Sequence, residues 1–392
     1  MLAPTGEGLA AGAFAVGGLG VTEQGVRLGR PARDLQRDAL ERALADAGLT
    51  RADIDGYIGT SSGTFDDLRH LGLSPRFAYT MQSGGATATW SVLNAIGAIV
   101  TGQATIVACV YGSAPSAGMR RVDGTKGGFG TFAYGYPRLY GMIGAGMAHA
   151  LHARRHMHRY GTTSEHLGAV AVAQRQHASV RPGTLGYQQP ITLEDHQSSR
   201  MVVDPFHLLD CCRDTDGGVV VLVTSLDRAR DLRSTPVRIL GAGTGHNIRN
   251  WWTGDVFDLH DDIAPAKATA FGQAGIGVDD VDVAALYDPF TISVIMQLEA
   301  YGFCPPGEGG PFVASGATAL GGAIPTNTGG GQLSGFYATG FTALSEALWQ
   351  LRKDAGATQV PDAEVALVSG HGGNGGVQNT WAHATLVLGV DR

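Results

Sequence analysis

Two parts of the chain carry histidines whose surroundings suggest chemistry. His152 and His156 fall within LHARRHMHRY at 151–160, and His371 stands in the glycine run SGHGGNGG at 369–376. The spacing of four resembles that of metal ligands on a helix, but no third ligand is visible, so a solvated polar face is favoured and no metal is expected. A histidine among glycines has few packing reasons to exist. For His371, a catalytic role and simple local turn hydrogen bonds are therefore both open.

The cysteines offer little chemistry. Cys109, Cys211, Cys212 and Cys304 are spread through 392 residues without a C-x-x-C pair. They are too few for a disulfide framework, and their spacing does not predict a structural zinc site. Cys109 lies in a predicted buried strand, which favours a core residue over a nucleophile.

Composition narrows the class of protein. Hydrophobic residues make up 44% and charged residues 16%, which predicts a large core. Glycine is about twice as frequent as the usual 7% or so, which predicts tight turns and close backbone approaches. A net charge of -7 without a basic stripe argues against nucleic acid as a partner. No signal-peptide pattern or long apolar run is visible, so we expect a cytoplasmic enzyme without a membrane span.

An internal repeat predicts two similar halves. DAGLTRADID at 46–55 and QAGIGVDDVD at 273–282 share four identical positions. Each copy follows a predicted amphipathic helix and precedes a predicted strand, at 56–60 and at 283–287. Alternating helices and strands indicate an α/β fold in which helices cover the faces of a sheet.

Later in each half come a glycine-rich turn, a long helix and a strand. We therefore divide the chain into an N-terminal half at 1–230, with an inserted loop region at about 112–205, and a C-terminal half at 231–392. The expected elements are a turn at 83–85, a helix at 86–100 and a strand at 104–110 in the first half, and 329–331, 340–352 and 364–369 in the second.

Several motifs resemble a known family. LYDPFTISVIMQLEAYGFCPPGEGG at 286–310 is similar to the H-D-C-F motif, helix and G-x-C-P-x-G-x-G loop of thiolases of the sterol-carrier/lipid-transfer type. DPFHLLDCCRDTDGGVVVLVTS at 204–225 and the run at 369–376 resemble further parts of these proteins. The resemblance implies an α/β thiolase fold, in which two similar halves form a five-layer αβαβα core, and a homodimer.

The sequence departs from the thiolases at their catalytic positions. A thiolase needs a cysteine nucleophile at a helix start, where the helix dipole favours the thiolate, but this chain has Ser-Gly-Gly at 83–85. The histidine of H-D-C-F is replaced by Tyr287. The G-H-P loop is replaced by 334–337, in which Tyr337 matches the general-base histidine across a short deletion.

These substitutions resemble a narrower group, the steroid side-chain-cleaving aldolases, which split a β-hydroxyacyl-CoA into a ketone and a shorter acyl-CoA. The resemblance implies that Tyr337 is the base and Tyr287 the acid, in an order that the sequence leaves interchangeable. His371 lies where thiolases carry their last catalytic residue. Because free tyrosine titrates near pH 10, one phenol is expected to have a lowered pKa. Asp288 is expected to cap the helix that follows it.

The predicted reaction is the cleavage of a bulky substrate, a 17-hydroxy C22 steroid CoA ester, into a ketone and propionyl-CoA without an acyl-enzyme. Two alternatives stay open: a thiolase-like acyltransferase with an unexpected nucleophile, and a non-catalytic acyl-CoA-binding subunit. The resemblance implies a coenzyme A thioester as substrate and no covalently bound cofactor. It also implies a small partner with a zinc ribbon and an OB-fold, or the tail domain of a hydratase.

Overall fold

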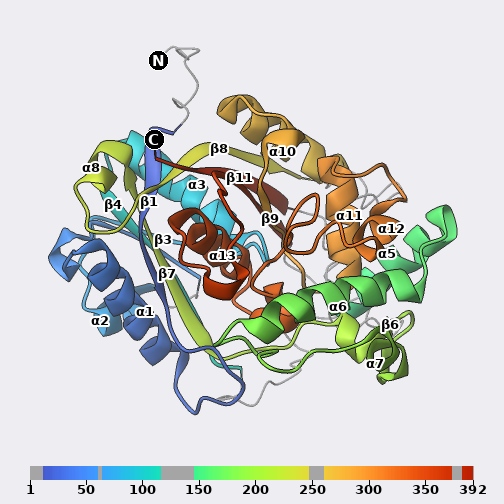
Figure 1. The fold of residues 1–392 in the computed structure, drawn as a ribbon. Helices are drawn as coiled ribbons and strands as arrows, with labels where there is room; N and C mark the ends of the chain where they lie inside the picture. Colours follow the sequence, from blue (N-terminus) through green and yellow to red (C-terminus); the bar gives the residue numbers. More distant parts are fainter. Residues whose placement is uncertain (1–11, 61–63, 116–144, 247–259, 373–381, 392) are drawn as a thin grey trace, which may run out of the picture.

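The computed structural model describes residues 12–60, 64–115, 145–246, 260–372 and 382–391, in which strands and helices alternate (Figure 1). The elements of the first half are β1 (Phe14–Val21), α1 (Ala32–Ala47), β2 (Gly56–Gly59), α2 (Thr64–Leu71), β3 (Phe77–Thr80), α3 (Thr87–Val100), β4 (Ile106–Ser113), α5 (Ala145–Tyr160), α6 (Ser164–Val180), α7 (Leu193–Ser198), β5 (Met201–Val203), β6 (Phe206–His207), β7 (Gly217–Ser225) and α8 (Leu226–Arg230). Those of the second half are β8 (Val237–Gly245), α10 (His260–Ala274), β9 (Val283–Ala285), α11 (Thr291–Tyr301), α12 (Gly309–Ala314), α13 (Phe341–Arg352), β10 (Val365–Gly372) and β11 (Ala382–Val390).

The main sheet runs through both halves in the order β3-β2-β4-β7-β1-β8-β11-β10-β9. In the first half β2 is parallel to β3 and β4, whereas β7 is antiparallel to β4 and β1. The second half repeats this pattern, because β9 is parallel to β10 and β11 is antiparallel to β10 and β8. A short antiparallel pairing of β1 with β8 joins the two parts.

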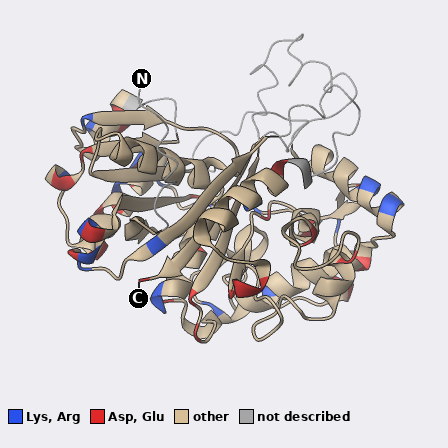
Figure 2. Ribbon diagram, turned by 90° about the horizontal axis from the view of Figure 1, so that it is seen from above, with Lys and Arg blue, Asp and Glu red and all other residues tan. Residues whose placement is uncertain are grey.

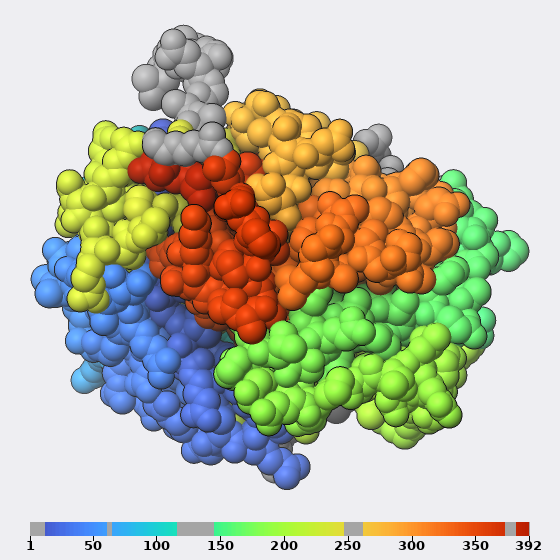
Figure 3. Space-filling model, viewed as in Figure 1, coloured from blue at the N-terminus to red at the C-terminus, as the bar shows by residue number. Residues whose placement is uncertain are grey.

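Helices form three layers around the two parts of the sheet. The largest core cluster combines α3 and α13 with strand residues of both halves, so these two helices lie in the middle. The outer face of the first half is covered by α1, and that of the second half by α10 and α11. Figure 3 shows the α13 region at the centre of one face, between the N-terminal half and the segments of α10 to α12. The arrangement has the five layers αβαβα that the sequence predicted.

The repeat marks equivalent turns that close each helix–strand unit. α1 ends at Gly48 with φ 72°, and Gly275, which follows α10, has φ 69°, a left-handed conformation that glycine adopts without strain. The Asp55 carboxylate accepts two N–H groups at the start of β4, at 2.7 and 2.9 Å. Asp282 accepts the two N–H groups at the start of β10, both at 2.9 Å. The glycine and aspartate positions of the repeat therefore have the same structural role in both halves.

Charged side chains lie mainly on the outer helices and loops, whereas the central strands are largely free of them (Figure 2). Among the described residues no helix combines the length and the apolar run that crossing a bilayer requires.

We predict that Asp282→Ala lowers the free energy of unfolding by about 1–3 kcal/mol, because two backbone N–H groups lose their acceptor. Chemical denaturation followed by circular dichroism measures the change. The control is Asp279→Ala, which removes an exposed carboxylate from the same turn. Equal stability of the two variants would contradict the assigned role.

Candidate active site

Tyr287 lies just after β9, where a buried polar network holds its backbone. Its N–H donates to Ser369 Oγ at 2.9 Å, and its carbonyl oxygen accepts from Gln297 Nε2 at 2.7 Å. Ser369 and Gln297 are fully buried and hydrogen-bonded to each other. Because a fully satisfied buried network is rigid, the position of Tyr287 is fixed.

Tyr337 lies in the loop between a π-helical turn at 331–335 and α13. The Thr215 hydroxyl accepts from the Tyr337 N–H and donates to the Tyr337 carbonyl oxygen, both at 3.0 Å. Thr215 is 1% exposed. A buried residue that precedes β7 therefore anchors a loop of the other half.

The phenol groups of Tyr287 and Tyr337 lie close enough to shift each other's pKa. Tyr287 is buried and Tyr337 is half-buried. Fifty positions separate the two residues in the sequence, yet the fold places their phenols next to each other. Two of the three predicted catalytic side chains are thus brought together.

Both phenols have a raised pKa. Burial is the main cause for Tyr287, whereas for Tyr337 the neighbouring Tyr287 comes first and burial second. The interaction between the two side chains lowers the pKa of Tyr287 and raises that of Tyr337, the pattern expected when the Tyr337 hydroxyl points its proton towards Tyr287. The expectation that one of the two phenols has a lowered pKa is therefore wrong within the described structure. The charges that act on the pair come from Cys212 and carboxylates such as Asp288, which oppose ionisation.

Two further side chains reach the pair, and the sequence did not single them out. Tyr111, near the end of β4, is buried, and its own pKa is raised by burial and by Tyr337. Its ring stacks on Phe341 at 5.7 Å between centroids. Cys212 lies close enough to raise the pKa of all three phenols. The available signal for Tyr111 was a single tyrosine near the end of an otherwise aliphatic buried strand.

Asp288 connects the two tyrosine-bearing segments. Its buried carboxylate accepts the Gln332 N–H at 3.0 Å and the Leu333 N–H at 3.3 Å. With the Gln174 amide oriented so that its nitrogen faces Asp288, that nitrogen donates at 2.7 Å. Burial raises the pKa of Asp288 to about 8 despite these donors.

The expectation that Asp288 caps α11 is wrong. α11 begins after Phe290, and no side chain caps it. The Asp288 carboxylate instead caps the turn at 331–335, because the fold brings the N–H groups of that turn within its reach.

The turn at 83–85, which precedes α3, has no room for a side chain at its last residue. A Cβ on Gly85 would lie 2.0 Å from Cζ of Tyr287 and 2.3 Å from the carbonyl oxygen of His371. The ring of Tyr287 therefore fills the space that a side chain at position 85 would need. A side chain at position 85 is therefore incompatible with the observed position of Tyr287.

The side chain of His371 does not join the tyrosine pair. Strand β10 extends to Gly372, so His371 is a buried strand residue and not a loop residue as expected. Gly370 and Gly372 face α3, so the alternation of a strand directs His371 to the opposite face. Only the His371 carbonyl oxygen lies beside Tyr287 and Gly85. The proposed catalytic role of His371 stays a prediction.

The expectation of a solvated histidine face on α5 is wrong. His152 is 2% and His156 5% exposed. The ring nitrogens of His156 bond to Thr162 Oγ1 at 2.6 Å and to Glu299 Oε2 at 3.0 Å. α5 turns this face towards α11, whose Glu299 and neighbouring apolar residues cover it.

Three of the four cysteines lack nucleophilic character. Burial raises the pKa of Cys109, which is fully enclosed in β4, and it raises the pKa of Cys211 and Cys304 to about 12. Since the thiolate is the reactive form, these thiols are inert at neutral pH.

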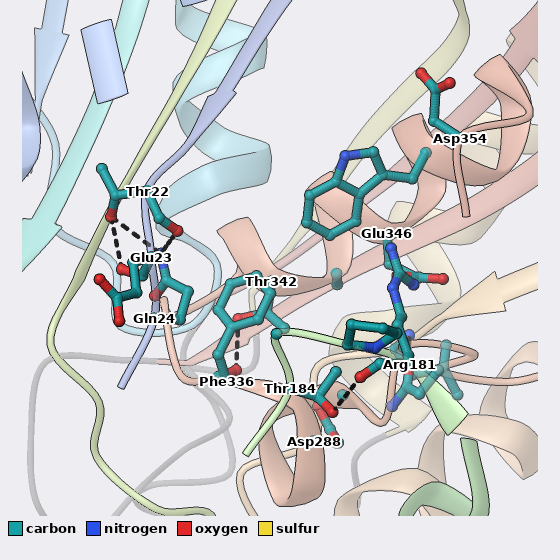
Figure 4. A pocket seen from close by; sticks show the side chains of 18 of the residues that line it. Thr22, Glu23, Gln24, Arg181, Thr184, Asp288, Phe336, Thr342, Glu346 and Asp354 are labelled. Atoms are coloured by element: carbon teal, nitrogen blue, oxygen red, sulfur yellow. Dashed lines mark hydrogen bonds and ion pairs between the residues drawn. The ribbon is translucent and has the colours of Figure 1, made fainter. Parts of the chain in front are cut away.

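A cavity of about 580 Å³ lies behind the tyrosine-bearing segments. Asp288 and Phe336 line it, but neither tyrosine does. Figure 4 shows Thr22, Glu23 and Gln24 on one side and Arg181 with Glu346 on the other. Arg181 forms an ion pair with Glu346 and stacks over Trp349 at 4.7 Å, so its charge is already neutralised.

We predict that Gly85→Ala lowers the free energy of unfolding by about 1–3 kcal/mol, because the new methyl group overlaps the ring of Tyr287. Thermal and chemical denaturation measure the loss. Gly97→Ala is the matched control, since a Cβ there meets no atom within 4 Å. An unchanged stability of Gly85→Ala would show that the ring of Tyr287 moves freely.

Comparison with known proteins places the chain in a family. A family model described as thiolase C-terminal domain-like matches residues 255–389. A steroid side-chain-cleaving aldolase of Thermomonospora curvata is 36% identical, covering 97% of this chain and 99% of that protein. A 17-hydroxy-3-oxo-4-pregnene-20-carboxyl-CoA lyase of Mycobacterium tuberculosis is 37% identical, covering 87% of this chain and 92% of that protein.

Solved structures agree with these relatives. The structure of an Ltp2-ChsH2(DUF35) aldolase matches with a TM-score of 0.89 and 36% identity, covering 98% of this chain and 100% of that one. Human mitochondrial 3-ketoacyl-CoA thiolase, at 17% identity and a TM-score of 0.67, shares the fold. With relatives at 36% and 37% identity over most of its length, the chain belongs to the thiolase superfamily and has the thiolase fold.

Proposed function

We propose that this protein is a carbon–carbon lyase that cleaves a β-hydroxyacyl-CoA by a retro-aldol reaction. The observation that carries the proposal is the pair of neighbouring phenols, Tyr287 and Tyr337, beside a helix start with no room for a side chain at Gly85. The relatives named as an aldolase and as a CoA lyase support the same chemistry.

The reaction needs two proton movements and no covalent intermediate. The β-hydroxyl group loses its proton and becomes the carbonyl of the ketone while the bond between the α and β carbons breaks. The bonding electrons pass to the thioester as an enolate, which takes up a proton at its α carbon. One proton leaves an oxygen and one arrives at a carbon, so a chain of hydrogen bonds can carry out both transfers.

The unequal effect of the two phenols on each other's pKa gives the proposed proton relay a direction. Tyr337 accepts the proton of the substrate hydroxyl while its own proton passes to Tyr287, which delivers a proton to the enolate. Both phenols begin and end neutral, so their raised pKa values are compatible with the reaction. Tyr287 is assigned as the acid, because the interaction between the two phenols favours ionisation of Tyr287 over that of Tyr337.

For the substrate we propose a 17-hydroxy C22 steroid CoA ester, which yields a ketone and propionyl-CoA. The support is the name of the Mycobacterium tuberculosis relative, which specifies a 17-hydroxy steroid-type CoA ester. Coenzyme A enters as part of the thioester, and the proposed steps need no covalently bound cofactor.

We also propose a homodimer and a second protein as partner. Among the described strands β3 lies at one edge of the main sheet, and 46% of Tyr79 is exposed there, which supports a contact with another chain at this edge. The similar Ltp2-ChsH2(DUF35) structure supports a partner protein. A small zinc-ribbon and OB-fold protein, or the tail domain of a hydratase, is the form we propose.

The thiolase-like alternative has little support, because the described cysteines with resolved pKa shifts are all held as neutral thiols. A non-catalytic binding subunit would not need two neighbouring phenols whose backbones are each held by separate hydrogen bonds. The lyase proposal accounts for both observations.

We predict that Tyr337→Phe and Tyr287→Phe each lower kcat by about 10²-fold or more, the range usual for lost acid–base groups. The double variant should be no slower than either single variant by more than a few-fold, because one missing hydroxyl already breaks the relay. Product formation is followed by mass spectrometry with the proposed CoA ester, with and without the partner protein.

Tyr187→Phe, at a partly exposed site on the loop after α6, is the control for loss of a phenol. If both single variants stay within threefold of the parent, the relay is wrong. If the parent itself releases no propionyl-CoA with the partner present, the proposed substrate is wrong.

We predict that kcat stays level from about pH 6 to about pH 9, because free tyrosine titrates near pH 10 and both phenols are shifted upward. A raised pKa keeps the proton bound over this range, and activity falls only when the pH passes the raised values. If the mechanism needed a phenolate, kcat would instead increase by up to tenfold per pH unit.

Asp288 is the one neighbouring group with a pKa of about 8, so a small step near that pH would come from its ionisation. Asp288→Asn removes such a step. A steep rise that persists in Asp288→Asn would assign the titration to the tyrosines and contradict the neutral relay.

A further inference from the structure

Three potential metal ligands meet on the face of the sheet opposite the tyrosine pair. His371 in β10 and His383 in β11 are directly paired across the antiparallel ladder, so both side chains point to the same face. Asp262, in the first turn of α10, lies above them. All three are buried, with at most 1% of each side chain exposed. We call them the Asp262–His371–His383 cluster.

The imidazole of His371 has no hydrogen bond to explain its burial. Neither ring nitrogen has a partner, and the nearest carboxylate oxygen of Asp262 is 3.7 Å from Nδ1, too far for a hydrogen bond. Buried polar groups are nearly always paired. Local turn hydrogen bonds, one of the two interpretations that the sequence left open, are therefore absent for this described residue.

The ring of His383 is oriented by neighbours on one side only. Its Nε2 lies 2.7 Å from the Tyr301 hydroxyl, which lies 2.6 Å from Thr385 Oγ1. When Nε2–H donates to Tyr301 and Tyr301 donates to Thr385, the lone pair of Nδ1 stays available. Nδ1 itself has no hydrogen-bond partner. Histidines that bind metals are typically held in this way by an outer partner.

The geometry fits a single cation. One donor atom from each of the three residues lies within 4.8 Å of the others. A tetrahedral zinc ion holds its ligand atoms about 3.3 Å apart, a spacing that small side-chain rotations reach. Burial and nearby imidazoles lower the pKa of His371, and burial lowers that of His383 to about 3, so both rings offer neutral donors.

An ion pair between a charged histidine and Asp262 is the competing explanation. It would require His371 to be protonated, but burial and the neighbouring His383 and His152 oppose that charge. Two neutral imidazoles and a carboxylate are instead a ligand set that suits late divalent metals.

We propose that Asp262, His371 and His383 form a structural binding site for a divalent cation, of which zinc is the best match. The site joins the first turn of α10 to the paired ends of β10 and β11. The site does not touch Tyr287 or Tyr337. It fixes the backbone of His371, whose carbonyl oxygen lies in the contact between Gly85 and Tyr287. His152, on α5, also lies close enough to influence His371.

The test measures metal on the full chain alone, because the proposed partner would bring zinc of its own. Protein from a medium containing zinc, iron and manganese is analysed by inductively coupled plasma mass spectrometry. We expect about one equivalent of zinc per chain, a loss of at least about fivefold in His371→Ala and His383→Ala, and retention in the control His177→Ala. His177 is an equally buried histidine that bonds to the Asn327 carbonyl oxygen, outside the cluster.

A second measurement does not depend on the folding of the variants. The parent chain is stripped with a chelator and titrated with Zn²⁺ or Co²⁺. We expect the melting temperature to rise by about 5 °C or more with saturating Zn²⁺, and Co²⁺ to produce visible absorption bands of a nitrogen and oxygen site.

A parent chain that carries no metal and shows neither change would overturn the proposal. Iron in place of zinc, lost in the same variants, would keep the site but correct its metal. Metal that is equally present in His371→Ala and in the parent would place it elsewhere and overturn the site. These readouts need no substrate, so they are independent of the tyrosine relay.

Discussion

The close approach of α3 to the end of β10 is the constraint on which the site depends. A Cβ on Gly372 would lie 2.4 Å from the Gly85 nitrogen, and one on Gly340 would lie 2.3 Å from the Gly85 carbonyl oxygen. Backbones therefore meet where side chains would normally separate them. This contact brings the starts of the two middle helices against the second half of the sheet, and it leaves a space beside Gly85 that the ring of Tyr287 fills.

The surroundings of the two phenols decide which form they take. A phenolate is costly where water is largely excluded and a second phenol lies alongside, so both tyrosines keep their protons. Their backbones are held separately. The buried network of Ser369 and Gln297 holds Tyr287, and Thr215 holds Tyr337. Asp288 then ties the two segments together across the turn at 331–335. The result is a preorganised pair of neighbouring phenols, which suits proton transfer better than nucleophilic attack.

Strand β10 serves two different purposes on its two faces. Its glycines allow α3 to approach on one face, while His371 points to the other, where Asp262 and His383 surround it. Because side chains alternate along a strand, a residue next to the site in sequence can lie outside it in space. Because His371 stands in a glycine run, the sequence predicted that it lies in a loop. In the structure it lies in strand β10.

Much of the fold and part of the site were predictable from the residues alone. The repeat marked equivalent positions in the two halves, and the structure shows that two of them, Asp55 and Asp282, accept the N–H groups at the start of a strand. Tyr287 and Tyr337 were found from motif positions. The sequence could not indicate that Asp288 binds a turn 44 positions away, or that Tyr111 joins the pair. Local sequence patterns reflect contacts between residues that are neighbours in the chain. The contacts of Asp288 and Tyr111 instead form only when packing brings remote segments together.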